Sequence, residues 1–580
     1  METKLPDTRA HKGWIVTHYT TIRSLISSFS ITEKILFACI SIICVISGLI
    51  LLYTLNKSFL VEVPDYGGSI TEGIVGSPRF INPILAISDA DRDLTSLVYS
   101  GLMKATSDGG LHPDLAETYS ISEDGLTYTF ILKKTAVFHD GTPVTADDIE
   151  FTVQKAQDAF LKSPRRSNWD GVKVEKIDEH TVRFVLKQAY SPFIQNTTLG
   201  ILPKHIWKNV DTESFPFSTF NTKPVGSGPY SVDSFATNAS GLPTTYTLHS
   251  FKKYSLGRPY IDTLVLKFYT NEKNLLDGFE NGDIESVNSI SPQNVALLST
   301  NNARTITQPL PRVFGVFFNQ NENPVLVNKE VRVALDRVLD KNQIIQEVLV
   351  GYGQALNGPL HTNTTDPTET TPEERLSDAR AILEKAGWVF NDQGVYEKKT
   401  GKDTEILSFS ISTSDAPELK ALAQNIQTRW QQLGARVEVK IFEVGDLNQN
   451  IIRPRKYDSL LFGEVLGRDL DVYPFWHSSQ RSDPGLNIAL YVNPKTDKLL
   501  EDYRKTTDDA VKKKYLSSFE TEIKDDTPAV FLYAPYFIYI TPTRVKNITL
   551  GQLTISGERF LNVHEWYINT NDVWKFFIKH

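Results

Sequence analysis

The stretch FHDGTPVTADDIEFTV, residues 138–153, combines a tight turn, a helix cap and the start of an amphipathic helix. Asp140-Gly141 predicts the turn, because Gly accepts a positive φ and an Asp side chain bonds to nearby backbone. Thr145 is a good N-cap, and the two Asp residues shortly after it occupy the positive first turn of the predicted helix. The apolar face of that helix is expected to contain Ile149, Val153, Ala156 and Phe160.

The polar groups of this stretch also allow a catalytic interpretation. An acid/base or metal cluster would draw on His139, Asp140, Asp147, Asp148 and Glu150. We favour the structural interpretation, because most of these carboxylates already have a place in the turn or in the cap.

The same stretch closely resembles the signature of the family 5 extracytoplasmic solute-binding proteins, the receptors of ABC importers for peptides, dipeptides and nickel. Three further runs resemble the family in the same order: residues 75–104, the turn PVGSGPY at 224–230, and residues 313–345. The resemblance covers residues 67–575. It implies an α/β, two-lobed fold of the periplasmic-binding-protein type II, with an extra α+β subdomain and no catalytic chemistry.

A membrane segment precedes this region. Residues 35–55 are an uncharged apolar run, which as a helix rises about 1.5 Å per residue and spans about 30 Å, one hydrocarbon core. Lys34 and Arg23 precede the run and only Lys57 follows it closely, so the positive-inside rule places the N-terminal side in the cytoplasm. A cleaved signal peptide and a lipoprotein signal at Cys39 are the rival interpretations, and we favour an uncleaved signal anchor.

Composition restricts the function further. A chain of 580 residues is too long for one core, and its net charge of −8 argues against a nucleic-acid binder. The two cysteines, Cys39 and Cys44, both lie in the predicted span, so the exported domain has no disulfide. The His residues are scattered, without a His-Glu-x-x-His motif, and we predict no metal and no cofactor.

The residues before the span have an amphipathic pattern of their own. A helix on the inner leaflet and a partly ordered tail explain this pattern equally well. Its apolar positions are Ile15, Tyr19, Ile22, Ile26 and Phe29.

The chain divides into six predicted segments. Within the last of them, a strand at 405–412, a helical face at 419–433 and a strand at 437–441 predict a parallel βαβ unit. The segments are a cytoplasmic tail (1–34), a transmembrane signal anchor (35–55), a linker (56–66), lobe one (67–107, 207–312 and 530–580), its extra subdomain (108–206) and lobe two (313–529).

The candidate ligand site lies in residues 457–480, YDSLLFGEVLGRDLDVYPFWHSSQ. In the place of this segment, peptide-binding members of the family present a carboxylate to the free amine of the ligand. Asp469 matches that position best, and Asp471 is the alternative. Arg468 is expected to bind the carboxylate of the ligand or to pair with Asp469. A solvated loop without a ligand is the competing interpretation.

Three residues in the other matching runs are further candidates for ligand contact: Asn82, Tyr230 and Asn319. The resemblance alone suggests them. A turn-forming Asn before Pro83 explains the first without any ligand.

The sequence therefore predicts a monomeric, non-enzymatic receptor tethered outside the cell membrane. We expect it to bind oligopeptides between its lobes and to deliver them to an ABC permease with separate ATPase subunits. The alternatives are a receptor for an oligosaccharide or a metal chelate, and a sensor that works without a transporter. An extracytoplasmic hydrolase is more remote, because the chain has no Gly-x-Ser-x-Gly elbow and no zinc motif.

Overall fold

The computed structural model describes residues 27–298, 302–361 and 370–577, and the chain forms two compact units. The first unit contains the chain up to Asp65 together with the residues from Asn569 onward, and the second is Tyr66–Ile568. The amphipathic pattern predicted between Ile15 and Ile26 lies outside the described residues.

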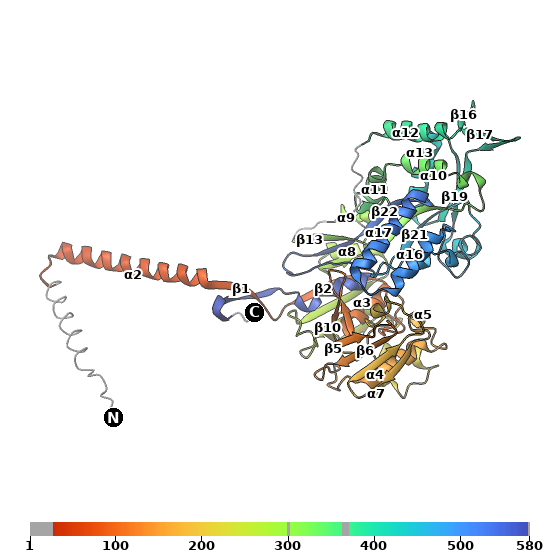
Figure 1. Ribbon diagram of the computed structural model, residues 1–580. Helices are drawn as coiled ribbons and strands as arrows, with labels where there is room; N and C mark the ends of the chain where they lie inside the picture. The colour runs from red at the N-terminus through yellow and green to blue at the C-terminus, as the bar shows by residue number, and fades with distance from the viewer. Residues whose placement is uncertain (1–26, 299–301, 362–369, 578–580) are drawn as a thin grey trace, which may run out of the picture. The chain divides into compact units, whose positions relative to one another are not determined.

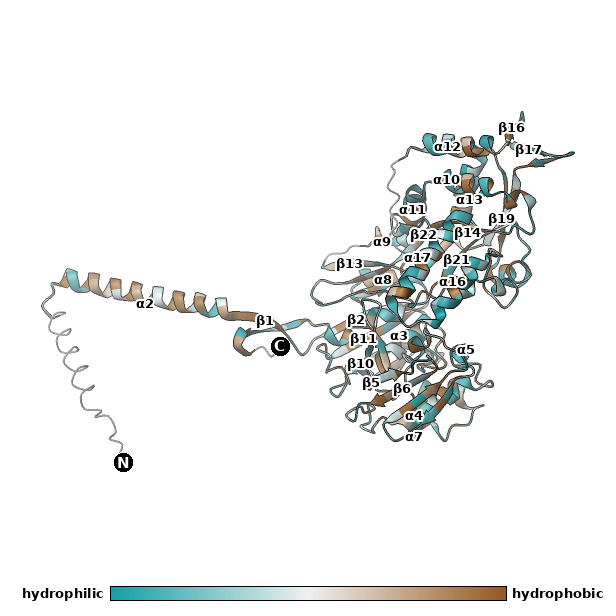
Figure 2. Cartoon of the chain, in the orientation of Figure 1, coloured by the Kyte–Doolittle hydropathy of each residue, from teal (hydrophilic) through white to brown (hydrophobic). Residues whose placement is uncertain are grey.

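In its described residues, the first unit contains one long helix, a two-stranded sheet and a short 3-10 helix (Figure 1). Helix α2, Ile31–Phe59, is long and apolar enough to cross a membrane and buries none of its residues (Figure 2). Strand β1, Leu60–Asp65, pairs antiparallel with β23, Asn569–Trp574. The range 56–66, predicted as a linker, thus contains the end of the helix and a strand. Likewise β23, which the sequence placed in lobe one, pairs with β1 instead.

The second unit is built on a mixed sheet in which ten described strands follow the order β20-β19-β21-β14-β22-β12-β2-β11-β10-β9, and two more, β13 and β15, pair with β22. Strand β22 is 14 residues long, and it pairs with β14 at one end and with β12 at the other. The strands of this sheet are β2 Ser69–Val75, β9 Tyr230–Thr237, β10 Pro243–Ser250, β11 Thr263–Tyr269, β12 Ser286–Asn288, β13 Ala303–Pro309, β14 Arg312–Phe318, β15 Gly353–Ala355, β19 Ser408–Ser414, β20 Arg436–Phe442, β21 Ser459–Val465 and β22 Ala529–Pro542.

One of the helices that connect the strands of this sheet belongs to the predicted βαβ unit. Strands β19 and β20 are parallel, with Ile411 opposite Val439, and α13 connects them, which confirms the prediction. Gly434 ends α13 with a φ of 111°, in the left-handed region that favours glycine. The helices are α3 Asp89–Val98, α8 Glu272–Glu280, α9 Pro292–Val295, α10 Lys329–Arg337, α11 Lys341–Leu349, α12 Pro372–Lys385, α13 Pro417–Leu433, α14 Val444–Asp446, α15 Tyr473–Trp476, α16 Pro494–Lys505 and α17 Asp509–Asp526.

Smaller sheets complete the second unit. A four-stranded antiparallel sheet in the order β5-β6-β8-β7 and three of the four short helices named here fall entirely within the range predicted for the extra subdomain. The remaining elements are β3 Met103–Ala105, β4 Leu111–Pro113, β5 Ala116–Ile121, β6 Thr127–Leu132, β7 Lys173–Lys176, β8 Thr181–Val185, β16 Val389–Phe390, β17 Tyr396–Thr400, β18 Asp403–Ile406, α4 Ala146–Gln157, α5 Arg166–Trp169, α6 Phe193–Asn196 and α7 Lys204–Trp207.

The opening stretch folds as its residues predict, with one exception. Gly141 has a φ of 89°, and the Asp140 carboxylate accepts a hydrogen bond from the Thr142 amide at 2.9 Å. Thr145 and Asp148 form a reciprocal capping box at the start of α4. The helix ends at Gln157, however, and Phe160, predicted on its buried face, is 87% exposed.

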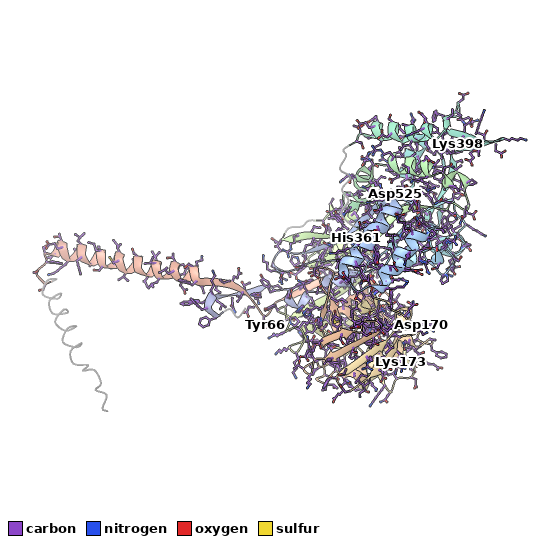
Figure 3. All side chains as sticks on the ribbon, in the orientation of Figure 1. Tyr66, Asp170, Lys173, His361, Lys398 and Asp525 are labelled. Carbon is purple, nitrogen blue, oxygen red and sulfur yellow. The ribbon has the colours of Figure 1, made fainter. Side chains whose placement is uncertain are left out.

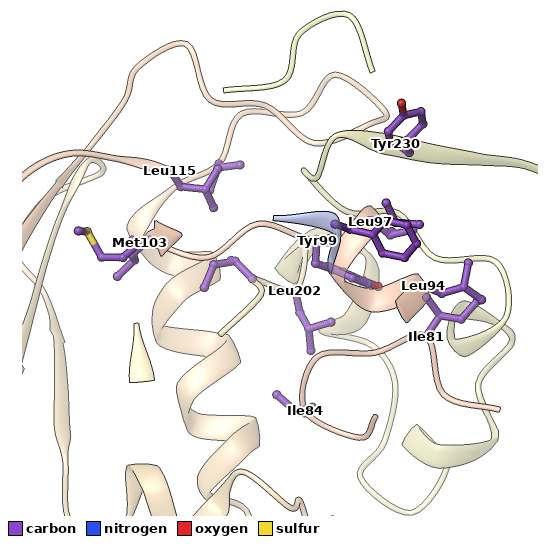
Figure 4. Close-up of a cluster of buried hydrophobic side chains, with 14 of the residues drawn as sticks. Ile81, Ile84, Leu94, Leu97, Tyr99, Met103, Leu115, Leu202 and Tyr230 are labelled. Atoms are coloured by element: carbon purple, nitrogen blue, oxygen red, sulfur yellow. The ribbon is translucent and has the colours of Figure 1, made fainter. Parts of the chain in front are cut away.

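Hydrophobic side chains form separate cores around the two halves of β22. Figure 4 shows part of the lobe-one core, where Leu94 and Leu97 of α3 pack with Ile81 and Leu202. In lobe two, α10, α11 and α13 cover one core. We use the terms lobe one and lobe two for the predicted ranges, whose boundaries remain a prediction.

Candidate ligand site

A short loop after β21 contains the three charged residues predicted for ligand binding. Leu470, between the two Asp residues, has a φ of 55°, a left-handed conformation that costs a non-glycine residue about 1–2 kcal/mol. Such local strain is typical of binding and catalytic loops. Here it turns the chain between Asp469 and Asp471.

Asp471 is fully engaged inside the protein. Arg504 donates to it from both Nε and Nη2, the latter at 2.6 Å, and Tyr190 donates its hydroxyl at 3.3 Å. The guanidinium of Arg504 also lies 3.8 Å from the ring centre of Tyr473. Because Asp471 is only 9% exposed and already paired, it is a weak candidate for a ligand's cation.

Asp469 has a different environment. Among the described residues, no Lys, Arg or His lies within ion-pair distance of its carboxylate. Its polar contact is the Asp471 amide at 3.4 Å, while Tyr503 donates to its backbone carbonyl. Burial, with the nearby charge of Asp471, raises the pKa of Asp469 to about 6. A partly buried carboxylate without a counter-charge is suited to accept a cation from a ligand.

Contacts from this loop reach lobe one. Arg468 forms an ion pair with Glu558 at 2.9 Å, and the two side chains are 5% and 19% exposed. The Ser191 amide donates to the Arg504 carbonyl at 2.9 Å. Elsewhere in the second unit, His361, labelled in Figure 3, lies 3.5 Å from the Gln552 amide nitrogen. The predicted pairing of Arg468 with Asp469 is not present.

The three other candidates form hydrogen bonds within the fold. Asn82 donates to Asn221 at 3.0 Å, and Tyr230 donates to the Ile261 carbonyl at 2.9 Å. Asn319 donates to the Arg455 carbonyl at 2.9 Å. All three are buried, and none of these contacts involves the loop at Asp469.

The glycine turn of residues 224–230 packs against the first matching run. A Cβ on Gly226 would lie 2.0 Å from the Val98 carbonyl oxygen, so only glycine fits there. His139 binds the same turn, accepting from the Gly226 amide at Nδ1 and contacting the Gly228 oxygen at Nε2. Burial lowers the pKa of His139 to about 4, so it is neutral and its role is structural.

Two further acidic residues of the opening stretch, Asp147 and Asp140, also have basic partners. Lys204 and Lys176 both contact Asp147, and His205 lies 2.7 Å from Asp140. In the described part of the chain, no group of three His, Cys, Asp or Glu side chains could hold a metal ion.

Sequence reasoning missed several polar residues around the site: Tyr190, Arg504, Glu558 and Glu464. The first three are far from the loop in sequence and gave no local signal. Glu464 did give one, because it shares the strand face of the apolar Leu460 and Phe462. It is 3% exposed, and burial raises its pKa well above the ordinary value of a glutamate.

The mixed α/β fold is that of periplasmic-type solute-binding proteins. The chain belongs to the bacterial extracellular solute-binding proteins, family 5, whose middle-region model matches residues 110–486. Its relatives in this family are solute-binding receptors.

Three comparisons describe the family neighbourhood. The oligopeptide-binding protein AppA of Bacillus subtilis is 30% identical over 519 residues, 87% of this chain and 92% of AppA. The structure of that protein in complex with a nonapeptide aligns with a TM-score of 0.63 at 28% identity, covering 87% of this chain and 100% of the chain in that structure. NikZ from Campylobacter jejuni, in complex with Ni(L-His), aligns with a TM-score of 0.65 at 25% identity, covering 86% and 99%.

Proposed function

We propose that this chain is the membrane-tethered substrate-binding protein of an ABC importer and that it binds oligopeptides between its two lobes. Similarity to the oligopeptide-binding protein AppA along most of both chains supports the ligand class. Helix α2 supports the tether, with residues 1–34 in the cytoplasm and the binding domain outside the membrane. Membership of the family supports delivery of the peptide to a permease with separate ATPase subunits.

Asp469 is the observation that carries the proposed ligand class. An α-ammonium group that leaves water needs a charged acceptor, and a hydrogen bond to a charged group contributes about 1.5–3 kcal/mol. Among the residues that the structure describes, Asp469 has no ion-pair partner, and the charge of Lys512 lowers its pKa only slightly. The ammonium of a bound peptide would complete the site.

The neighbouring charges have different proposed roles. Asp471 positions Tyr190 and Arg504, and the latter holds the Ser191 backbone of lobe one. Arg468 joins the lobes through Glu558. A ligand shifts the equilibrium between separated and closed lobes only if it binds the closed state more tightly. The charge pairs between the lobes help to determine how stable the closed state is.

The direct test is calorimetric titration of the full chain in detergent micelles with a pool of di- to hexapeptides. We expect saturable binding that weakens at least tenfold in Asp469→Ala and after acetylation of the peptide amine. Asp378→Ala, on an exposed carboxylate of α12, is the matched control and should bind like the unchanged protein.

Other results of this titration would support one of the alternative functions. Binding that survives both Asp469→Ala and acetylation contradicts the amine contact and leaves the receptor role. Binding of nickel-histidine or an oligosaccharide in place of peptides contradicts the peptide class. Mass spectrometry of the recovered ligand distinguishes a receptor, which returns the peptide intact, from a hydrolase.

A further inference from the structure

The end of β23 and the short 3-10 helix after it contain three exposed aromatic side chains. Trp574 ends β23, and Phe576 and Phe577 lie in the 3-10 helix η8, Lys575–Phe577. Their exposed fractions are 46%, 83% and 76%. Single exposed apolar residues are ordinary, whereas exposed apolar side chains gathered in one place are typical of a surface that contacts a protein or a membrane.

The register of the β1–β23 pair fixes the place of this group along α2. Leu60 directly follows Phe59, the last residue of α2, and its partner in β23 is Trp574. Since the strands are antiparallel, the chain beyond Trp574 continues past the start of β1 toward the helix (Figure 1). Figure 2 shows that the apolar colour of α2 returns in the turn after β23.

The distance from the apolar run to this group matches the thickness of a lipid headgroup layer. The run ends at Leu55, five residues before Leu60. The chain rises about 7 Å over that distance, and the headgroup layer on each side of a bilayer is about 5–7 Å thick. If α2 spans the membrane, Leu60 and Trp574 therefore lie at headgroup level.

The residue types fit that layer. Trp is enriched at membrane interfaces, and Lys side chains place their charge there while their stems lie on apolar surface. Lys57 and Lys575 lie at this end of the first unit, where anionic lipid phosphates would be. The acidic Glu62 and Asp572 face each other further along the ladder, away from the helix.

We propose that residues 574–577 form a second membrane contact, in which the three aromatic side chains insert among the lipid headgroups of the leaflet from which α2 emerges. The bilayer then holds both strands of the small sheet, one through α2 and one through Trp574, Phe576 and Phe577. This inference rests on the proposed function, in which α2 stays attached and spans the membrane.

Spin labels at three sites test the proposal in the full chain. Replacing Cys39 and Cys44 by Ala removes both cysteines, and single Cys residues are then placed at Leu52, Phe217 or Phe577. Leu52 reports on α2, and Phe217, 80% exposed in the second unit, is the aromatic control. Each protein is reconstituted into vesicles of phosphatidylcholine and phosphatidylglycerol, and collisions with oxygen and with a water-soluble nickel chelate are compared.

We expect the label at position 577 to collide with oxygen severalfold more than the label at 217 does, relative to the nickel chelate. The label at 52 should show the strongest preference for oxygen. A label at 577 that behaves like that at 217, while position 52 is in lipid, overturns the second contact and leaves the anchor. Loss of the lipid signal at 52 overturns the anchor, and the inference with it.

Discussion

Two groups of buried carboxylates balance their charges in different ways. In lobe one, Arg559 contacts both Glu72 and Asp93 at 2.7 Å, and all three side chains are at most 2% exposed. In lobe two, Arg504 contacts Asp471, and Asp469 has no ion-pair partner among the described residues. The first group is complete without a ligand, whereas the second leaves one carboxylate without a cation.

The comparison separates a structural charge network from a binding site. Burial raises the pKa of Glu72 and of Asp93, and Arg559 opposes both shifts. Tyr539 and Asn288 add hydrogen bonds to Glu72 at 2.9 and 3.1 Å. A raised pKa alone therefore does not mark a functional residue. The missing partner, beside a left-handed backbone turn, distinguishes Asp469.

The largest effect is expected from a substitution that breaks the network of Arg559, Glu72 and Asp93. Arg559→Leu leaves two buried carboxyl groups without their cation, and we expect the free energy of unfolding to fall by about 3–5 kcal/mol. Arg337→Leu is the control, since its partner Asp378 is 51% exposed and such a surface pair contributes about 0–1 kcal/mol. Urea unfolding followed by circular dichroism measures both. Equal losses in the two variants would contradict the distinction.

The second prediction concerns Asp469→Asn, which removes the charge that has no ion-pair partner among the described residues. The pKa of Asp469 is raised from 3.8 to about 6, so the folded state binds the proton more tightly than the unfolded state. Stability from this group is therefore lost as pH rises through that window. Two pKa units correspond to about 3 kcal/mol, which partial exposure reduces to about 1–2 kcal/mol. Asp469→Asn should stabilise the protein by that amount at pH 7.

The gain from Asp469→Asn should vanish below about pH 4, where the carboxyl is protonated in both states. Asp471→Asn is the matched comparison with the opposite sign, because it removes the partner of Arg504. Unfolding curves at pH 4 and pH 7 provide the measurement. Destabilisation by both substitutions at pH 7 would show that Asp469 has a partner in solution.

Ligand binding should follow the same titration. Peptide amines stay protonated between pH 5 and 7, but Asp469 takes up a proton below about pH 6. We expect affinity for free-amine peptides to weaken about tenfold from pH 7 to pH 5, or about 1.4 kcal/mol. Calorimetry at both pH values measures this change, which Asp469→Asn should abolish. A pH-independent affinity in the unchanged protein would remove Asp469 from the contact.

Much of the fold could be predicted because its signals are local. The turn and cap at Asp140 and Thr145 are determined by residues within a few positions, and the βαβ unit follows from periodicity. The prediction for Phe160 failed at the helix end, where the Asp158 carboxylate accepts the Phe160 amide at 2.9 Å and continues the chain as a turn.

Contacts between distant segments left no such signal. Nothing near Asp471 in sequence points to Arg504 or Tyr190, and nothing near Leu60 points to Trp574. The sequence therefore located the loop but could not tell which of its two Asp residues already has a cation. That assignment depends on side chains that the fold brings in from other elements.

The smallest expected effect concerns the ion pair between Arg468 and Glu558. Glu558 also accepts hydrogen bonds from the Thr554 amide and hydroxyl, so Glu558→Gln keeps the shape of this turn and removes the charge. We expect the change to weaken peptide binding by about 1 kcal/mol or less, because the lobes lose one attraction that favours their approach. A double-mutant cycle with Arg468→Gln isolates the pair. Calorimetric coupling of about 0.5–1 kcal/mol supports a pair that acts between the lobes. Zero coupling, with both single variants weakened, would instead assign Arg468 to the carboxylate of the ligand, as the sequence first suggested.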